Sequence, residues 1–201
     1  MATSGIDLCS NALLRLGVEP ISSFTEGDVG NTCGTIYPDF IVNLLSIYDW
    51  QFASTKVQLA RLSTAPLTEY TYQFQLPSDM IKLQKVYIDT GTGRTVVTDY
   101  RLQDGKLLTN NDTIYIDYTR NVAVSEFPPY FVEFAVLALA SVLAIAVTDK
   151  AEYAQSFHQL AYGTANDNGN GGSFGKAKKL DSFQQPSKTV SYNRIITERF
   201  S

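Results

Sequence analysis

Residues 28–53, DVGNTCGTIYPDFIVNLLSIYDWQFA, carry apolar side chains at three- and four-residue steps. This spacing predicts a core helix with a wide apolar face. Pro38 lies inside the pattern and removes one backbone donor, so it should bend the helix or begin its main run. At the far end Trp50 and Phe52 bracket Gln51, and the helical period gives way to alternation. A large aromatic side chain is therefore expected where this helix meets a β region.

An earlier helix is predicted near the start of the chain. Ser4 followed three positions later by Asp7 is typical of a capping pair at a helix N-terminus. The helix is expected to run to Leu16 and to end at Gly17. Its buried stripe is expected to consist of Ile6, Cys9, Leu13 and Leu16.

Residues 54–122 alternate apolar and polar positions in short runs that turn signals separate, which predicts successive antiparallel strands. Ile81 and Leu83 share one side of their strand, whereas Val86 and Ile88 belong to the other. That strand therefore either shifts register at a bulge or is buried on both faces. The turns are TGTG at 90–93, Asp-Gly at 104–105 and NND at 110–112, with a strand expected over 95–102.

Residues 131–147 form the most apolar run in the chain and predict a helix that begins after Pro128-Pro129. The run between Glu133 and Asp149 is shorter than the roughly 20 residues that a bilayer requires. Its alanines suit close helix packing, so a buried helix is favoured over a membrane span. A more polar helix is expected over 152–165, with an inner stripe of Tyr153, Phe157, Leu160 and Ala161.

The composition NDNGNGGSFG at 166–175 is typical of a flexible linker. The residues after it are too polar to build a core, so we expect an extended C-terminal tail that lies along another surface, with an added strand around 189–196. The rest of the chain is expected to fold without residues 176–201. The apolar anchors of the tail are Leu180, Phe183, Val190, Tyr192, Ile195, Ile196 and Phe200.

The charge of the chain is low and unevenly placed. Charged residues make up 18% of the 201 residues, which indicates either extensive subunit contacts or a surface rich in Ser, Thr and Asn. Residues 176–201 hold six basic and two acidic residues, a balance of +4. Because the net charge of the whole chain is −4, residues 1–175 carry −8. A basic tail on an acidic body can dock on an acidic neighbour or on another copy of the body.

No pattern in the sequence predicts an active site, a cofactor or a metal. GNGGSFGK at 169–176 has the wrong glycine spacing for a phosphate loop and Ala177 in place of Ser or Thr. His158 has no nucleophile motif beside it, and the acids Asp99, Asp104, Asp112 and Asp117 suit turn geometry. Cys9 and Cys33 are expected to be reduced core residues of a protein assembled in the cytoplasm, with no signal peptide. Lysines near Phe174 and Phe183 leave nucleic-acid binding as an alternative.

These patterns predict an α+β protein: an antiparallel helical bundle with an inserted antiparallel β domain and an extended C-terminal tail. The expected domains are residues 1–53 with 123–165 for the bundle, 54–122 for the β domain, and 166–201 for the linker and arm. Both halves of the chain are needed to complete the helical core. The expected core residues are Leu13, Leu16, Cys33, Tyr37, Pro38, Leu44, Leu45, Trp50 and Phe52.

An ordered set of motifs over roughly the first 85 residues resembles one protein family. The motifs are NALLRLGVEPISSF at 11–24, EGD at 26–28, Cys33, Tyr37-Pro38, Leu44-Leu45, Trp50 to Ala53, and FQLPSDMIKL at 74–83. In this order and spacing they are similar to the tail tubular protein A family, the head-to-tail adaptors of short-tailed bacteriophages. The chain departs from the family at 39–41, where such adaptors commonly have an Arg-Asp pair.

The resemblance implies a structural virion protein in the phage neck, made in the host cytoplasm and not an enzyme. Adaptors of this family form a ring of twelve subunits under the portal protein, receive the tail nozzle or tube, and let DNA pass without specific binding. By this resemblance, residues 90–94 and 104–112 would meet the tail partner, and the C-terminal arm would grip the portal or a neighbouring subunit. The candidate partner-binding residues are Lys176, Lys178, Lys179, Phe183, Val190, Tyr192, Arg194, Ile195, Ile196, Arg199 and Phe200.

Overall fold

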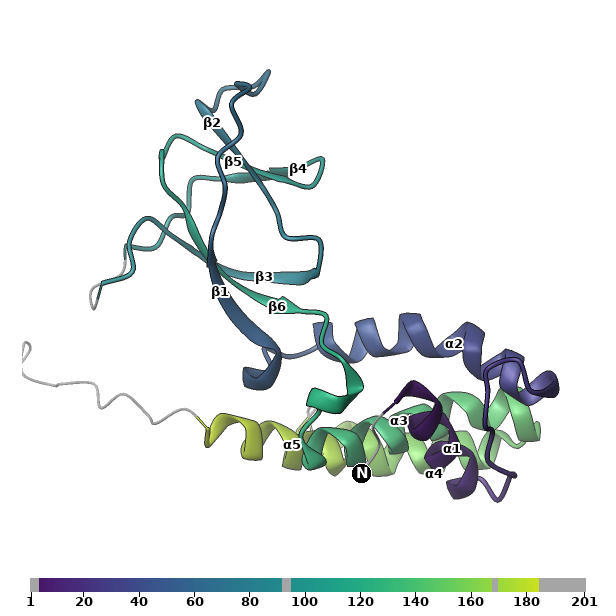
Figure 1. The fold of residues 1–201 in the computed structure, drawn as a ribbon. Helices are drawn as coiled ribbons and strands as arrows, with labels where there is room; N and C mark the ends of the chain where they lie inside the picture. The colour runs from purple at the N-terminus through teal and green to yellow at the C-terminus, as the bar shows by residue number, and fades with distance from the viewer. Residues whose placement is uncertain (1–3, 92–94, 168–169, 185–201) are drawn as a thin grey trace, which may run out of the picture.

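The computed structural model describes residues 4–91, 95–167 and 170–184 and is α+β. Figure 1 shows the helices gathered at one end of the molecule and the strands rising from them toward the other end. The helices are α1 (Gly5–Arg15), α2 (Gly27–Ser46), α3 (Pro129–Thr148), α4 (Ala151–Tyr162) and α5 (Gly172–Ser182). The strands are β1 (Ser54–Gln58), β2 (Tyr72–Gln75), β3 (Met80–Tyr87), β4 (Arg101–Gln103), β5 (Lys106–Thr109) and β6 (Tyr115–Arg120).

Helix α1 begins and ends as the sequence predicts. The Ser4 hydroxyl accepts a hydrogen bond from the Asp7 amide at 3.2 Å, and the Asp7 carboxylate accepts one from the Ser4 amide at 3.0 Å. This reciprocal capping box satisfies two donors that a helix start otherwise leaves unpaired. Gly17 stops the helix with a φ of 72°, a conformation that favours glycine. Cys9, Leu13 and Leu16 are buried, as predicted, and Ile6 is half-buried.

Helix α2 contains Pro38 and places most of the predicted core residues against the other helices. Cys33, Leu44 and Leu45 are buried, and Tyr37 is half-buried. The prediction that Pro38 belongs to the core is wrong, because its side chain is exposed. Pro38 shares the outer face of the helix with the exposed Thr35 and Val42, at steps of three and four residues.

Trp50 is fully buried where α2 gives way to the β region, which confirms the prediction of a large aromatic at this junction. Its indole N–H donates a hydrogen bond to the Leu44 carbonyl at 3.0 Å. Its ring centroid lies 4.9 Å from that of Phe131 on α3 and 6.0 Å from that of Phe174 on α5. The core therefore joins the N-terminal helices to segments more than eighty residues later. Tyr48, Phe52 and Phe134 complete the ring of aromatic neighbours.

The β region consists of two three-stranded antiparallel sheets, with strand orders β1-β6-β3 and β2-β5-β4. β3 shifts register against β6 between Met80 and Lys82 and again between Leu83 and Lys85, so the bulge alternative is the correct one. The predicted Asp104-Gly105 turn joins β4 to β5, and both residues have positive φ. The strand predicted over 95–102 is divided: Val96 forms a single bridge with Tyr87 of β3, and only β4 at the other end pairs as a strand, with β5. The chain between β5 and β6 crosses from one sheet to the other.

Helix α3 is the central helix of the helical end and packs against α1, α2, α4 and α5. Ten of its twenty residues are buried, including Phe131, Phe134 and Ala138. By length and composition it is the one helix among the described residues that could cross a membrane, a weak criterion that buried core helices also satisfy. On α4 the predicted inner stripe is correct for Ala161, which is buried, and Phe157 is half-buried, but it is wrong for Tyr153 and Leu160, which are exposed.

Candidate partner-binding surface

Residues 172–182 form helix α5, which contacts α3 and α4. The prediction of a flexible linker followed by an extended tail is therefore wrong for this part of the chain. Phe174 and Ala177 are buried, and the Phe174 ring centroid lies 5.1 Å from that of Phe134. The inner face of α5 thus adds to the core that Trp50 organises.

Glycines in the first turn of α5 allow close approach of the backbone. Gly172 has a φ of 57°, and a Cβ added to it would lie 2.7 Å from the Ala161 carbonyl oxygen. A Cβ on Gly175 would lie 1.8 Å from the Asn170 carbonyl oxygen. A side chain at either position would collide with backbone, so glycine is required where α5 turns back onto α4. A glycine-rich segment is compatible with a tight turn and with a flexible linker, and composition alone does not distinguish the two.

Asp181 anchors the C-terminal end of α5. Its side chain is fully buried, and its two carboxylate oxygens accept hydrogen bonds from the Tyr130 hydroxyl at 2.9 Å and the Gln51 amide at 2.8 Å. Burial, together with the hydrogen bond to Asp181, raises the pKa of the Tyr130 phenol above its usual range. One carboxylate therefore connects α5 to the start of α3 and to the residue that follows Trp50.

Replacing Asp181 with alanine is expected to destabilise the protein by about 2–4 kcal/mol, because two partly buried donors lose their acceptor. Urea unfolding followed by circular dichroism measures this change. Ser182→Ala, at the exposed neighbouring position, is the matched control. A loss below about 1 kcal/mol for Asp181→Ala would contradict the anchoring role.

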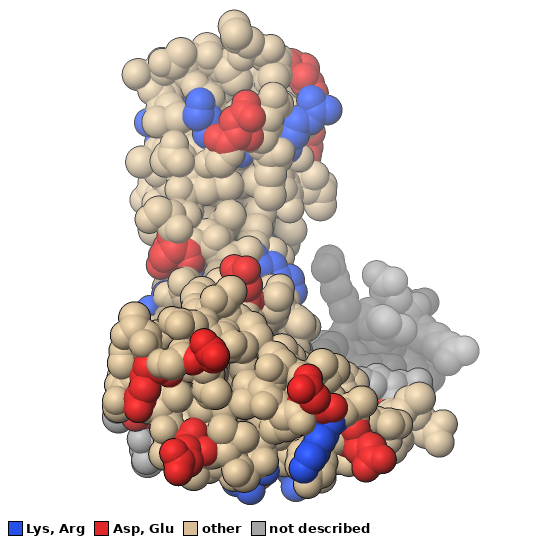
Figure 2. All heavy atoms as spheres, turned by 90° about the vertical axis from the view of Figure 1, so that its right-hand side faces the viewer, with Lys and Arg blue, Asp and Glu red and all other residues tan. Residues whose placement is uncertain are grey.

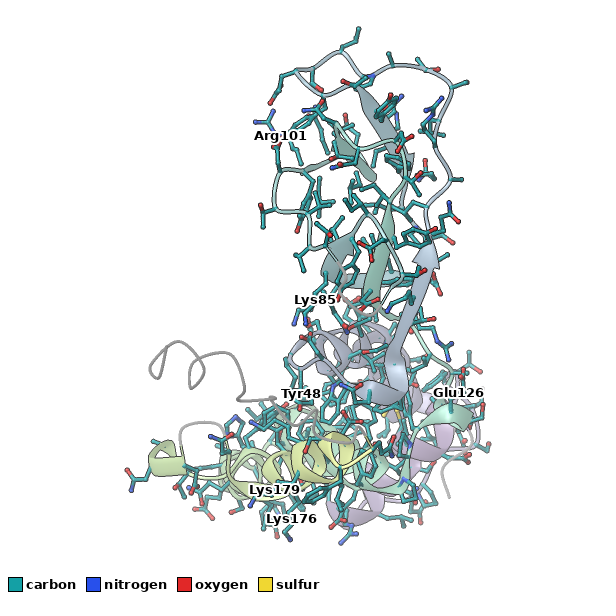
Figure 3. The ribbon with its side chains drawn as sticks, turned by 90° about the vertical axis from the view of Figure 1, so that its left-hand side faces the viewer. Tyr48, Lys85, Arg101, Glu126, Lys176 and Lys179 are labelled. Carbon is teal, nitrogen blue, oxygen red and sulfur yellow. The ribbon has the colours of Figure 1, made fainter. Side chains whose placement is uncertain are left out.

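The outer face of α5 combines cations with apolar side chains. Lys176, Lys179, Leu180 and Phe183 follow one another at i, i+3, i+4 and i+7, so they share one side of the helix. The two lysines are exposed and lie on the face that Figure 3 presents. Leu180 is 50% exposed and Phe183 is 80% exposed. An apolar pair this exposed beside two cations is typical of a surface that meets a partner.

Of the predicted partner-binding residues, the structure brings three together on this outer face: Lys176, Lys179 and Phe183. Lys178 lies on the flank, where its ammonium is 4.4 Å from the Phe174 ring centroid and donates a hydrogen bond to the Asn170 side chain at 2.7 Å. Leu180, which the sequence predicts as an apolar anchor of the tail, also lies on this face. The others lie outside the described residues: Val190, Tyr192, Arg194, Ile195, Ile196, Arg199 and Phe200.

A polar groove of about 360 Å³ lies beside the junction of α2 with the first sheet. Two of its carboxylates are paired: Asp117 lies 3.1 Å from Lys56, and Asp49 lies 2.8 Å from the nearby Lys82. The Gln84 amide donates hydrogen bonds to the hydroxyls of Ser54 and Thr119. The Lys82–Asp49 pair links the helical end to the β region, whereas the other contacts lie within the first sheet.

The residues weighed for catalysis stay apart in the fold. His158 is exposed on α4 and stacks on Tyr162, with ring centroids 4.8 Å apart. Asp99 accepts a hydrogen bond from the Tyr70 hydroxyl, and Asp104 forms the β4–β5 turn. Within residues 4–91, 95–167 and 170–184, no three His, Cys, Asp or Glu side chains cluster as metal ligands do.

Cys9 and Cys33 are both fully buried free thiols between α1 and α2. Burial and the proximity of Cys33 raise the pKa of the Cys9 thiol, and burial also raises the pKa of Cys33. Burial, with a smaller contribution from Cys9, raises the pKa of Tyr37 from 10.0 to about 12. These groups stay neutral in the folded protein at a pH where they ionise in the unfolded chain.

The free energy of unfolding is therefore expected to fall at alkaline pH. A raised folded-state pKa gives a contribution that is full below the unfolded values of 9.0 for the thiols and 10.0 for tyrosine and is lost as the pH rises toward the folded values. Urea unfolding at steps from neutral pH to about pH 11 tests this. Tyr37→Phe should reduce the loss, whereas Tyr153→Phe, at an exposed position, should not. Stability that stays constant over this range would contradict the expectation.

Comparison with known proteins leaves the chain without an assigned relative, since neither a protein-family model nor a curated protein matches it.

Proposed function

We propose that this chain is a structural virion protein, a head-to-tail adaptor that forms a ring between the portal and the tail nozzle or tube of a short-tailed bacteriophage. In this proposal the helical end is an antiparallel bundle and the β region is inserted into it. An extended C-terminal arm grips the portal or a neighbouring subunit. The adaptor acts by geometry, so it turns over no substrate and lets DNA pass without specific binding.

The observation that carries the proposal is the ordered resemblance over residues 11–83 to the tail tubular protein A family. The positions of its motifs in the fold support this argument. Trp50 to Ala53 form the junction between the helical end and the first sheet, and FQLPSDMIKL runs from β2 into β3. The resembling residues therefore build the part of the molecule that fixes how its two ends are connected.

The distribution of surfaces also supports an adaptor. The outer face of α5 lies at the helical end, whereas the Asp104-Gly105 turn belongs to the second sheet, the one farther from the helices (Figure 1). Two separated surfaces suit a protein that joins one neighbour above to another below. In the proposal the α5 end serves the portal or a neighbouring subunit, and the tip at 104–112 serves the tail partner.

Sedimentation of the purified chain, alone and with portal protein, tests this function. The cost of ordering the arm should keep the free chain monomeric or weakly associated, and portal should recruit it into a ring. A stable dodecamer without portal would contradict the assembly order. A chain that does not bind preformed portal at any concentration would contradict the adaptor function itself.

A nucleic-acid-binding accessory protein is the second candidate, favoured by the exposed lysines of α5 near Phe183. It predicts salt-sensitive binding to DNA that disappears when Lys176, Lys178 and Lys179 are replaced by alanine. The acidic remainder of the chain opposes this reading, because it repels phosphates. A mobility-shift assay at two salt concentrations separates the two candidates.

A further inference from the structure

The end of the helical part opposite α5 is acidic. Near the α1–α2 connection and the α3–α4 turn there are five exposed carboxylates and two exposed cations, Arg15 and Lys150. Figure 2 views the molecule from this side, and acidic atoms outnumber basic ones over its helical part. The carboxylates are Glu19, Glu26, Asp28, Asp149 and Glu152. We call this surface, with its exposed apolar residues Leu14, Ile145 and Tyr153, the acidic end.

The acidic end also exposes apolar side chains. Ile145 near the end of α3 is 60% exposed, and Leu14 near the end of α1 is 57% exposed. Tyr153 at the start of α4, predicted as a core residue, is 40% exposed. The acidic end thus combines apolar anchors with negative charge, whereas the outer face of α5 combines apolar anchors with positive charge.

These two surfaces cannot meet within one molecule. Asp181 on α5 contacts Tyr130 at the start of α3, and Asp149 directly follows its end. A helix of that length spans about 30 Å, at roughly 1.5 Å per residue. Complementary surfaces at opposite ends of a subunit produce head-to-tail contacts between copies, and such contacts close into a ring when the rotation permits.

We propose that the outer face of α5 in one copy docks on the acidic end of the next copy, with Lys176 and Lys179 facing Asp149 and Glu152. Leu180 and Phe183 pack against the exposed apolar residues of that end. This contact rests on the proposed ring and specifies which surfaces form it. Charge complementarity selects this pairing, because contact between two α5 faces or two acidic ends would bring like charges together.

Disulfide trapping tests the contact, because it captures weak association that sedimentation misses. A chain with Lys179→Cys and Glu152→Cys, oxidised with copper phenanthroline in air, should give a ladder of linked oligomers. The two single-cysteine chains mixed together should give mainly dimers. The native chain is the control for Cys9 and Cys33, which are buried. Arg101→Cys with Glu152→Cys, which pairs the β region with the acidic end, is the control for position.

Charge reversal supplies the second readout. Lys176→Glu should lower the trapping rate by about tenfold, as attraction becomes repulsion in a partly exposed pair. Asp149→Lys in the same chain should restore most of the rate. A missing ladder, in a chain that portal still assembles into rings, would overturn this contact and leave the adaptor function intact. If Lys176→Glu leaves the ladder unchanged but abolishes DNA binding, the proposed contact is also overturned, and the nucleic-acid candidate is favoured.

Discussion

Replacing Trp50 with alanine is expected to destabilise the protein by about 3–5 kcal/mol, a large part of the stability of an ordinary domain. The side chain is fully buried, and its ring contacts Tyr48 just after α2, Phe131 on α3 and Phe174 on α5. Removing it leaves a cavity where three segments distant in sequence meet, and the Leu44 carbonyl loses its donor. Both the lost burial and the cavity contribute to the expected cost.

Circular dichroism is the appropriate probe, since Trp50 is the only tryptophan and its removal abolishes tryptophan fluorescence. Trp50→Phe should cost less, because a smaller ring still fills part of the space. Phe183→Ala, which truncates an aromatic that is 80% exposed, should change stability by no more than about 0.5 kcal/mol. Equal effects of Trp50→Ala and Phe183→Ala would show that Trp50 does not organise the core.

The second large effect concerns where the chain is truncated. Removing residues 176–201 is expected to destabilise the body by about 3 kcal/mol or more, because it deletes half of α5 with the buried Ala177 and Asp181. The burial of these two residues argues against the expectation that the body folds unchanged without residues 176–201. A stop codon after Gln184 keeps α5 and should leave the free energy of unfolding within about 0.5 kcal/mol of the full chain.

The two truncations separate stability from assembly. If residues 185–201 grip the portal or a neighbour, the chain that ends at Gln184 should fold normally and fail to join heads to tails in an in vitro complementation assay. The chain that ends at Gly175 should fail in both respects. Normal joining by the chain that ends at Gln184 would remove the role proposed for the arm.

Local signals predicted the elements that local chemistry determines. The Ser4–Asp7 capping box, the Gly17 stop and the Asp104-Gly105 turn each depend on a few adjacent residues, and each lies where the sequence placed it. The Trp50 junction was predictable because the change from helical period to alternation coincides with a large aromatic.

The errors arose where packing between distant segments decides the structure. Helix α5 has few apolar residues, and its stability depends on Phe174 meeting Trp50 and Phe134 and on Asp181 meeting Tyr130. None of these contacts is visible in the composition of 166–182. The exposure of Tyr153 and Leu160 has the same origin, since the helical spacing of α4 does not specify how much of its face α3 covers.

The candidate surface was predicted in part. The basic, apolar character of the residues after 175 indicated partner binding, and Lys176, Lys179 and Phe183 do lie together. The sequence placed them on an extended arm, whereas a docked helix holds them in a fixed arrangement. The complementary acidic end was not predicted, because its carboxylates come from segments separated by more than a hundred residues.

Electron microscopy of the native particle with this protein labelled tests the central claim most directly. We expect a ring of labelled subunits at a single vertex, between the portal and the tail, with the β region directed toward the tail. Label elsewhere in the particle, or a protein that is absent from purified virions and acts on a substrate as an isolated monomer, would contradict it.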